Sequence, residues 1–246
     1  MSETTSVRTA ATVILLRRLE PTGFQVFLTR RPEGMRFLGG MYCFPGGGVS
    51  KEDSSPRMMA RCAGVTPQQA RNIIGAQFRP QAALGFWTAA IRELFEEVGI
   101  LLTVGDSGSA VSLQAMPSDR LAEKHAALVS KALSFAELLE SENLYCDVSA
   151  LTHFSHWQTP AQNSLRFDTR FFLAALPPAQ TPLPSSYEVI HSLWLTPDQA
   201  IQLFERGELP LIFPTFASLR TLADFETLES LFQEFSHAGA VASAAR

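Results

Sequence analysis

The order of hydrophobic and polar positions predicts strands and helices that alternate without a regular repeat. Residues 11–16 are apolar and rich in β-branched side chains, and residues 25–29 alternate polar and apolar side chains, as strands do. Glu20-Pro21-Thr22-Gly23 lies between them and is typical of a turn. Later segments with strand patterns are 151–157, 170–176 and 187–195.

Helices are predicted where a capping residue precedes apolar side chains at helical spacing. Over residues 85–98 these side chains form one stripe, which consists of Trp87, Ala90, Ile91, Leu94 and Val98, and Gly99 follows as a C-terminal cap. Further helices are expected at 66–77, 121–133, 134–141, from 196 onward and at 215–235. This mixture predicts an α+β fold, an α/β/α sandwich around a mixed sheet with C-terminal helices.

Length and composition bound the class of protein. The chain has 246 residues, of which 46% are hydrophobic and 18% charged, and its net charge is −4. These values predict one domain over 1–246 with a frayed tail at 236–246, and no general attraction for nucleic acid or an anionic membrane. Three cysteines without a CxxC pair, and no apolar run of about 18–20 residues, predict a cytoplasmic protein without a disulfide framework or membrane span.

The predicted helix 85–98 carries three carboxylates on the face opposite its apolar stripe. Glu97 follows Glu93 at i,i+4 and Glu96 follows it at i,i+3, so the three lie together. Like charges at this spacing destabilise a helix unless a cation lies among them, and hard divalent ions such as Mg²⁺ prefer oxygen ligands. The alternative is a solvated acidic face, against which the glycine-rich loop and the arginine upstream both weigh.

Residues 92–100, Arg-Glu-Leu-Phe-Glu-Glu-Val-Gly-Ile, resemble the helical half of the Nudix box, R-E-U-x-E-E-x-G-U with U aliphatic, and Phe44-Pro45-Gly46-Gly47 resembles its glycine loop. Two departures stand out. The interval from Gly47 to Arg92 is 45 positions instead of about fourteen, so roughly thirty residues are inserted, within 50–84. Counted back from Arg92, Leu84 also stands where the family has a glutamate that is generally not an inner metal ligand.

The resemblance implies a Nudix hydrolase fold, a bound Mg²⁺ or Mn²⁺, and hydrolysis of a diphosphate linkage. It makes Glu93 and Glu97 the main metal ligands, Glu96 a direct or water-mediated ligand, and the carbonyl of Gly47 a further ligand. Arg92 would orient Glu93. In such a reaction the metal lowers the pKa of its bound water and neutralises charge on the diphosphate oxygens.

Segments on either side of the box resemble the coenzyme A-hydrolysing branch of the family. Upstream, 28–31, Arg36, Gly40 and 44–47 follow the spacing of the coenzyme A diphosphatase signature, with departures at Phe27 and Pro32. Downstream, 153–160 and 166–172 resemble mammalian peroxisomal Nudix hydrolases of coenzyme A and its esters, which also carry a long insertion in the box. The resemblance implies that Arg31 and Arg36 bind substrate phosphates, as planar guanidinium groups do.

Three further residues are weaker candidates. Glu188, shortly before Trp194, stands where many Nudix enzymes place a loop acid that faces the metals, so it is a base, an extra ligand or a plain loop acid. Arg166 and Arg170 either bind phosphate or pair with Asp168.

The leading interpretation is a metal-dependent enzyme that cleaves coenzyme A or acyl-coenzyme A to 3′,5′-ADP and 4′-phosphopantetheine or its acyl form. The alternatives are a Nudix hydrolase of ADP-ribose, NADH or a dinucleoside polyphosphate, and an inactive Nudix-fold binding module, which has no need of three repelling glutamates. A basic pocket for the 3′-phosphate would distinguish coenzyme A from the other substrates.

We also expect residues 50–84 to form a flap at the rim of the site that contacts the pantetheine arm. The sequence is compatible with a homodimer and does not decide between a monomer and a dimer.

Overall fold

The computed structural model describes residues 7–35, 38–106, 108–109, 111, 118–183, 186 and 188–244. In this part of the chain, seven strands form one mixed sheet with the order β10-β2-β1-β9-β8, in which β3 pairs with β2 and β4 with β1. Their bounds are β1 Val7–Arg18, β2 Phe24–Arg30, β3 Tyr42–Cys43, β4 Gly46–Gly48, β8 Thr152–Gln158, β9 Arg166–Ala175 and β10 His191–Leu195.

A second, smaller sheet, which the sequence did not predict, has the order β5-β7-β6. Its strands are β5 Cys62–Ala63, β6 Thr103–Val104 and β7 Tyr145–Asp147.

The central strand β1 gives the sheet its mixed character. It pairs in parallel with β9 and antiparallel with β2 and β4. Because its side chains alternate between the two faces, β1 contributes to two hydrophobic cores, with Ala11, Val13 and Leu15 in one and Ile14 and Leu16 in the other. Both faces of the sheet are therefore covered, and the predicted α+β fold with a mixed sheet and flanking helices is confirmed.

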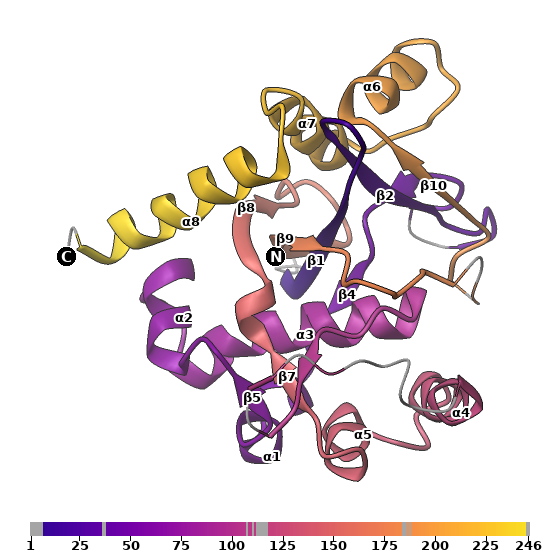
Figure 1. Ribbon diagram of the computed structural model, residues 1–246. Coiled ribbons are helices and arrows are strands. Elements are labelled where there is room, and N and C mark those ends of the chain that lie inside the picture. Colours follow the sequence, from indigo (N-terminus) through magenta and orange to yellow (C-terminus); the bar gives the residue numbers. More distant parts are fainter. Residues whose placement is uncertain are drawn as a thin grey trace, which may run out of the picture.

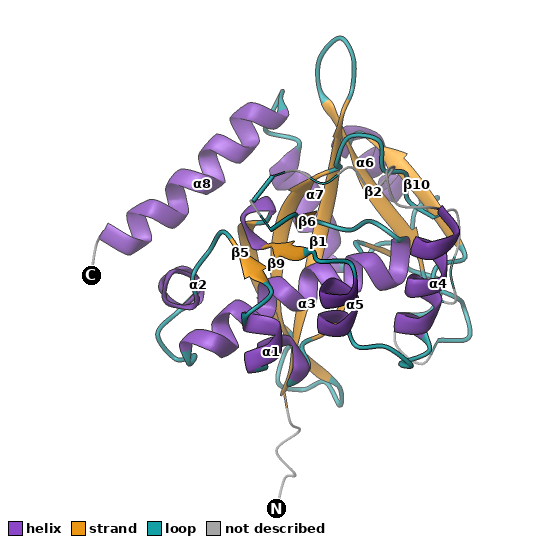
Figure 2. Cartoon of the chain, turned by 60° about the horizontal axis from the view of Figure 1, so that its bottom comes forward, coloured by secondary structure: helices purple, strands orange, loops and turns teal. Residues whose placement is uncertain are grey.

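Helices form a layer on each face of the sheet, as Figure 1 and Figure 2 show. The layer on the Ala11 face contains α1 Pro56–Met59, α2 Pro67–Ile74, α3 Pro80–Val98, α4 Ser118–Val129 and α5 Phe135–Ser141. The layer on the Ile14 face contains α6 Pro197–Glu205, α7 Phe213–Leu222 and α8 Leu228–Ala244. None of the described helices is long and apolar enough to cross a membrane.

Helix α3 packs across the sheet and carries the predicted apolar stripe. It begins at Pro80, whose ring fits the first helical turn, and so starts earlier than the predicted residue 85. It ends where Gly99 adopts the left-handed conformation with φ 72°. Trp87, Ile91 and Leu94 of the stripe are completely or almost completely buried, so the opposite edge of the helix is left to its polar residues.

The inserted segment 50–84 packs against the body of the domain. It contains the 3₁₀ helix η1 Glu52–Ser54, helices α1 and α2, and the first turn of α3. Thr66 and Gln69 form the predicted capping box at the start of α2, which ends at Ile74. Met58, Ala70 and Ile74 are buried in the same core as α3. Two short helices cannot be stable alone, and here they are stabilised by docking against α3.

The structure moves several other predicted boundaries. Strand β9 starts at Arg166 instead of 170, because the preceding residues pair with β1 and β8, while β10 starts only at His191 instead of 187. The helix predicted at 215–235 is two helices, α7 and α8. The backbone of α8 stays helical through Ala244, where the sequence predicted a frayed tail from 236.

Candidate active site

The glycine strand β4 lies directly against the acidic face of α3. A Cβ atom on Gly47 would come 2.5 Å from the carboxyl carbon of Glu93, so only glycine allows this approach. The backbone N–H of Gly46 donates a hydrogen bond of 3.1 Å to Oε2 of Glu97. The two halves of the motif, separated by the insertion in sequence, therefore meet in the fold and place Glu93 and Glu97 beside the same backbone.

Arg92 connects the carboxylates to the glycine strand. Its Nη1 donates to Oε1 of Glu93 at 2.8 Å and to Oε2 of Glu96 at 3.2 Å. Its Nη2 donates to the carbonyl of Gly48 at 2.8 Å. The guanidinium thus holds Glu93 in one orientation, which is the role that the resemblance implies for it.

Asp53 is a site residue that the sequence analysis missed. Its two carboxylate oxygens accept from Nε and Nη2 of Arg92 at 2.8 Å and 3.0 Å, and its side chain is 2% exposed. The backbone N–H and hydroxyl of Ser50 donate to Oδ2 of Asp53 at 2.7 Å and 2.9 Å and fix it from the other side. The signal in the sequence was Ser50-x-x-Asp53, a capping-box pattern.

The position of Asp53 also changes where the insertion begins. In the Nudix box the glutamate in question lies eight positions before the arginine, which is why a count back from Arg92 reached Leu84. In a box without an insertion, glycine and arginine are about fourteen positions apart, so the same glutamate also lies about six positions after the glycine. Asp53 is six residues after Gly47, whereas Leu84 is 1% exposed in the core. Counting forward from the glycine thus identifies an acid that pairs with Arg92, and the extra residues lie after Asp53.

Burial shifts the pKa values of the three glutamates upward. Glu97 is buried, whereas Glu93 and Glu96 are partly buried. Burial, together with the charge of Glu96, raises the pKa of Glu93 to about 7 against the opposing effect of Arg92. Burial, and then the charges of Glu93 and Glu188, raise the pKa of Glu97 well above its ordinary value. Burial likewise raises the pKa of Glu96.

The donor chemistry of this cluster fits a divalent metal ion. Carboxylate and carbonyl oxygens are the ligands that Mg²⁺ and Mn²⁺ prefer, and a cation would offset the repulsion that raises these pKa values. Among the described residues, no group of three or more histidine, cysteine, aspartate or glutamate side chains is arranged to bind an ion directly. Two of the carboxylates, those of Glu93 and Glu96, accept hydrogen bonds from Arg92.

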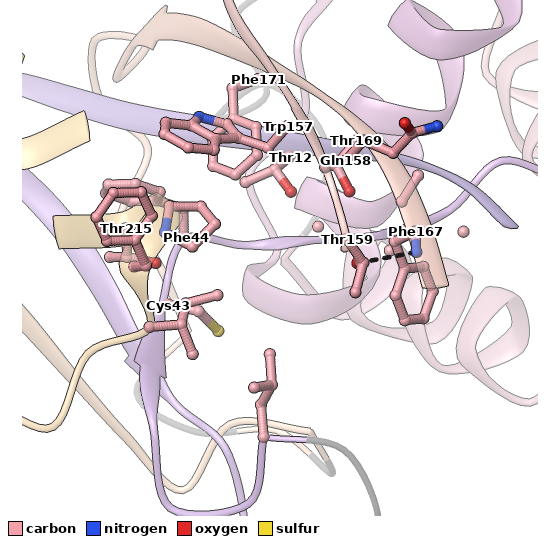
Figure 3. A pocket seen from close by; sticks show the side chains of 18 of the residues that line it. Thr12, Cys43, Phe44, Trp157, Gln158, Thr159, Phe167, Thr169, Phe171 and Thr215 are labelled. Carbon is pink, nitrogen blue, oxygen red and sulfur yellow. Dashed lines mark hydrogen bonds between the residues drawn. The ribbon is translucent and has the colours of Figure 1, made fainter. Parts of the chain in front are cut away.

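A cavity of about 780 Å³ opens on the other side of β4, on the sheet face that α7 covers. Gly46, Gly47 and Gly48 form its end nearest the carboxylates. Figure 3 shows its side chains, with Cys43, Phe44 and Thr215 on one side and Thr159 and Phe167 on the other. No residue of 50–84 lines it.

Two of the predicted site residues, Arg31 and Glu188, line this cavity. Nη2 of Arg31 is 3.9 Å from Oε2 of Glu188. Nε of Arg31 is buried and has no hydrogen-bond partner in the described part of the chain, while the side chain as a whole contributes to the cavity wall. Glu188 is half exposed, and its charge contributes to the raised pKa values of Glu96 and Glu97.

Arg166 and Arg170 point away from the cavity. Strand alternation directs Phe167, Thr169 and Phe171 into it, which leaves the arginines on the opposite face. Nη1 of Arg170 donates to Oδ1 of Asp168 at 2.5 Å, and its side chain is 2% exposed.

Both arginines have partners within the fold. The guanidinium of Arg170 lies over the rings of Phe78 and Phe86, and Nε of Arg166 donates to the carbonyl of Thr159. Of the two alternatives given by the sequence, Arg170 thus shows the pairing with Asp168, and neither arginine lines the cavity. Arg36, the other predicted phosphate ligand, lies outside the described residues.

Comparison with known proteins agrees with this geometry. A family model described as the NUDT19 Nudix domain matches residues 4–222. The acyl-coenzyme A diphosphatase NUDT19 of Gallus gallus is 29% identical over 248 residues, which cover 87% of this chain and 65% of that protein. The acyl-coenzyme A diphosphatase NUDT19 of Homo sapiens is 28% identical over 236 residues, which cover 85% of this chain and 63% of that protein. The chain thus spans slightly less than two thirds of these relatives.

A solved structure supports the fold. The crystal structure of a NUDIX hydrolase from Alicyclobacillus acidocaldarius superimposes with a TM-score of 0.73 at 27% identity, and covers 94% of this chain and 97% of that one. The likeness extends over the insertion as well as the motif, because so little of either chain is left out. The match of the family model to residues 4–222, together with the paired glycine strand and acidic helix, shows that the chain belongs to the NUDT19 Nudix domain family.

Proposed function

We propose that this chain is a divalent-metal-dependent diphosphatase that cleaves coenzyme A or acyl-coenzyme A. The observation that carries the proposal is the apposition of Glu93 and Glu97 with the glycine strand β4, beside a cavity of substrate size. A buried group of like charges is costly to maintain, and a module that only bound nucleotides would gain nothing from it.

Each residue has a role that its contacts suit. Glu93, Glu96, Glu97 and the carbonyl of Gly47 would hold the ion. A bound Mg²⁺ or Mn²⁺ supplies an acidified water and offsets charge on the diphosphate oxygens. Arg92, clamped by Asp53, keeps Glu93 in position.

The chemistry at the diphosphate follows from the groups at the end of the cavity. Arg31 lines the cavity and donates to a diphosphate oxygen. A water oxygen forms a new bond to phosphorus, and the bond from phosphorus to the bridging oxygen breaks. Glu188, at the cavity and near the acids, accepts the proton released by the water, as a general base does. The products are two phosphorylated fragments, 3′,5′-ADP and (acyl-)4′-phosphopantetheine.

The choice of coenzyme A over other diphosphates rests on the relatives and on the segment upstream of the glycine loop. Both the avian and the human relative carry the name acyl-coenzyme A diphosphatase. Arg31, which belongs to the upstream signature, does line the cavity.

One observation favours a second candidate, a Nudix hydrolase of ADP-ribose, NADH or a dinucleoside polyphosphate. Of the described residues that line the cavity, Arg31 alone is cationic, so the basic pocket expected for a 3′-phosphate is not found there.

The experiment is a substrate panel with product masses. Wild-type protein is incubated with coenzyme A, acetyl-coenzyme A, ADP-ribose, NADH and diadenosine polyphosphates, each with Mg²⁺, with Mn²⁺ and with EDTA. Release of 3′,5′-ADP and 4′-phosphopantetheine that requires the metal, at a higher kcat/KM than for ADP-ribose, supports the proposal. Faster cleavage of ADP-ribose or a dinucleotide would establish the second candidate, and no cleavage of any diphosphate would leave an inactive binding module.

A further inference from the structure

The cavity beyond β4 is charged at one end only. Of its described lining residues, the ionisable carboxylate and guanidinium groups belong to Glu188 and Arg31, which face each other beside the glycines. The remaining walls come from β1, β8, β9 and the start of α7, and they present aromatic rings, hydroxyl groups and amides. This separation of charge distinguishes the two halves of the proposed substrate.

The halves of coenzyme A differ in charge in the same way. On one side of the diphosphate is an adenosine with a 3′-phosphate, and on the other is the uncharged pantetheine arm, which carries two amides and, in the esters, an acyl chain. Burying a phosphate dianion without a cationic partner is strongly unfavourable. An uncharged arm with amides meets no such penalty.

We propose that this cavity holds the acyl-pantetheine arm and that the nucleotide half lies outside it. The assignment rests on the proposed function and deepens it, because it states which end of the substrate the protein reads. The diphosphate then lies at Arg31 and the glycine strand, and the arm runs along the sheet toward α7.

The polar side chains of the walls suit the amides of the arm. Gln158 and Asn163 each offer a donor and an acceptor, and Thr169 offers a hydroxyl. Thr159 is already engaged, because its hydroxyl accepts from the N–H of Phe167 at 3.0 Å (Figure 3). Gln158 and Asn163 therefore suit the amides of a flexible, uncharged chain, with the hydroxyl of Thr169 beside them.

The aromatic residues at the far end suit an acyl chain. Phe213, the first residue of α7, is 70% exposed although it is large and apolar. Its ring centroid lies 5.6 Å from that of Trp157 with an angle of 84° between the planes. Perpendicular rings leave no parallel slot for a nucleobase to stack in, whereas an aliphatic chain that covers Phe213 removes apolar area from water.

Kinetics with Phe213→Ala test the acyl end. Because Phe213 is exposed, the substitution removes a cavity wall without opening the core. We expect KM for octanoyl-coenzyme A to rise about tenfold, whereas KM for free coenzyme A should change less than about twofold. A tenfold change in affinity corresponds to the exposure of about two methylene groups to water. The matched control is Val129→Ala on α4, which is also an exposed apolar residue and does not line the cavity. An unchanged ratio of the two KM values in Phe213→Ala would overturn the assignment.

Binding of the separate halves gives a readout that does not depend on turnover. In EDTA, octanoyl-4′-phosphopantetheine should change the tryptophan fluorescence of the wild type, and the change should disappear in Trp157→Phe, which keeps a ring at that position. The 3′,5′-ADP half should leave the signal of Trp157 unaltered. A Trp157 signal from 3′,5′-ADP alone would reverse the orientation and indicate that the amides at the start of α7 bind the 3′-phosphate.

The two levels of the proposal fail differently. If the wild type cleaves no coenzyme A compound but does cleave another diphosphate, the proposed function is wrong and this assignment falls with it. If it cleaves coenzyme A and the octanoyl ester, and Phe213→Ala and Trp157→Phe alter neither KM nor fluorescence, only the placement of the arm is wrong.

Discussion

Arg92 and Asp53 form a two-pronged ion pair across the inserted segment, with Nε to Oδ1 at 2.8 Å and Nη2 to Oδ2 at 3.0 Å. The planar guanidinium matches the carboxylate at both oxygens, which fixes its orientation as well as its position. The same guanidinium reaches Glu93 through Nη1. The acidic face is therefore supported by one short element, η1, which carries Asp53 and lies where the extra residues begin.

Asp53→Asn should loosen this support. The variant keeps the shape of the side chain but removes the charge opposite Arg92, so Glu93 loses its fixed orientation. We expect kcat to fall about 10- to 100-fold with KM nearly unchanged, as for residues that orient metal ligands. Breaking a buried pair should also lower the free energy of unfolding by about 3 kcal/mol. Steady-state kinetics and denaturant unfolding measure the two effects.

The matched control for Asp53→Asn is Glu52→Gln, which changes an exposed acid in the same 3₁₀ helix. Equal kcat in the two variants would contradict the role of Asp53.

The parts of the site that the sequence predicted are those set by short spacings. Glu93, Glu96 and Glu97 share a face because helical geometry places i,i+3 and i,i+4 residues together. The glycine loop was recognised because Gly46-Gly47 is a local pattern.

The parts that it missed depend on contacts between distant segments. Asp53 is separated from Arg92 by the insertion, so a count from one end of the box reached Leu84 and a count from the other reached Asp53. The direction of Arg170 follows from the register of β9 against β1 and β8, and one residue of shift would have turned it into the cavity. The cavity itself is closed by Phe213, whose segment shows no pattern related to the Nudix box.

Glu97→Gln should abolish most activity and stabilise the metal-free protein. Glu97 is 6% exposed, and burial and the charges of Glu93 and Glu188 raise its pKa. Glutamine retains an oxygen for the N–H of Gly46 but removes a carboxylate from the site. We expect kcat to fall by about 10²-fold or more at saturating Mg²⁺, because charge on the diphosphate oxygens is less well offset. The melting temperature in EDTA should rise. Turnover close to that of wild type would exclude Glu97 from the metal site.

Arg31→Ala should weaken substrate binding more than it slows the reaction. The guanidinium lines the cavity, and in the proposed function it binds the diphosphate equally in ground and transition states. We expect KM for coenzyme A to rise about tenfold or more and kcat to change less. Arg31→Lys should restore part of the affinity, because a point charge cannot form the two-pronged contact.

The control for Arg31 is its neighbour Arg30, which is directed elsewhere. Nε of Arg30 donates to the carbonyl of Gly40, and its Nη2 pairs with Glu33. Arg30→Ala should leave KM within about twofold of wild type, since an exposed pair of this kind contributes little. A similar rise in KM for both alanine variants would assign the effect to net charge and not to contact.

His153 should make the fold sensitive to acid. Burial, and then the charges of Arg170 and His156, lower its pKa from 6.5 to about 4. Between these values the unfolded chain binds a proton that the folded chain does not, so the free energy of unfolding falls as the pH drops from 6.5 toward 4. The loss from this residue is at most about 3 kcal/mol.

His153→Phe should flatten that part of the stability profile. The ring of His153 packs edge-on against Phe172 with centroids 5.8 Å apart, a contact that a phenyl ring can also make. Denaturant unfolding of wild type and variant is measured at intervals of pH from 4 to 7.5. The two should agree at pH 7.5 within about 1 kcal/mol and diverge in favour of the variant below pH 6. Parallel profiles over the whole range would show that another group causes the acid sensitivity.

Ile74→Ala should reveal the inserted segment as a structural support. Ile74 is 7% exposed and belongs to the core that α3 also forms, so its truncation leaves a cavity and should cost about 2–4 kcal/mol of stability. Ile73→Ala, on the neighbouring half-buried position of α2, should cost less. Because no residue of 50–84 lines the cavity proposed for the substrate, the ratio of kcat/KM for octanoyl-coenzyme A to that for free coenzyme A should stay that of wild type below the melting temperature. A changed ratio in Ile74→Ala with an intact fold by circular dichroism would instead support a flap that contacts the substrate.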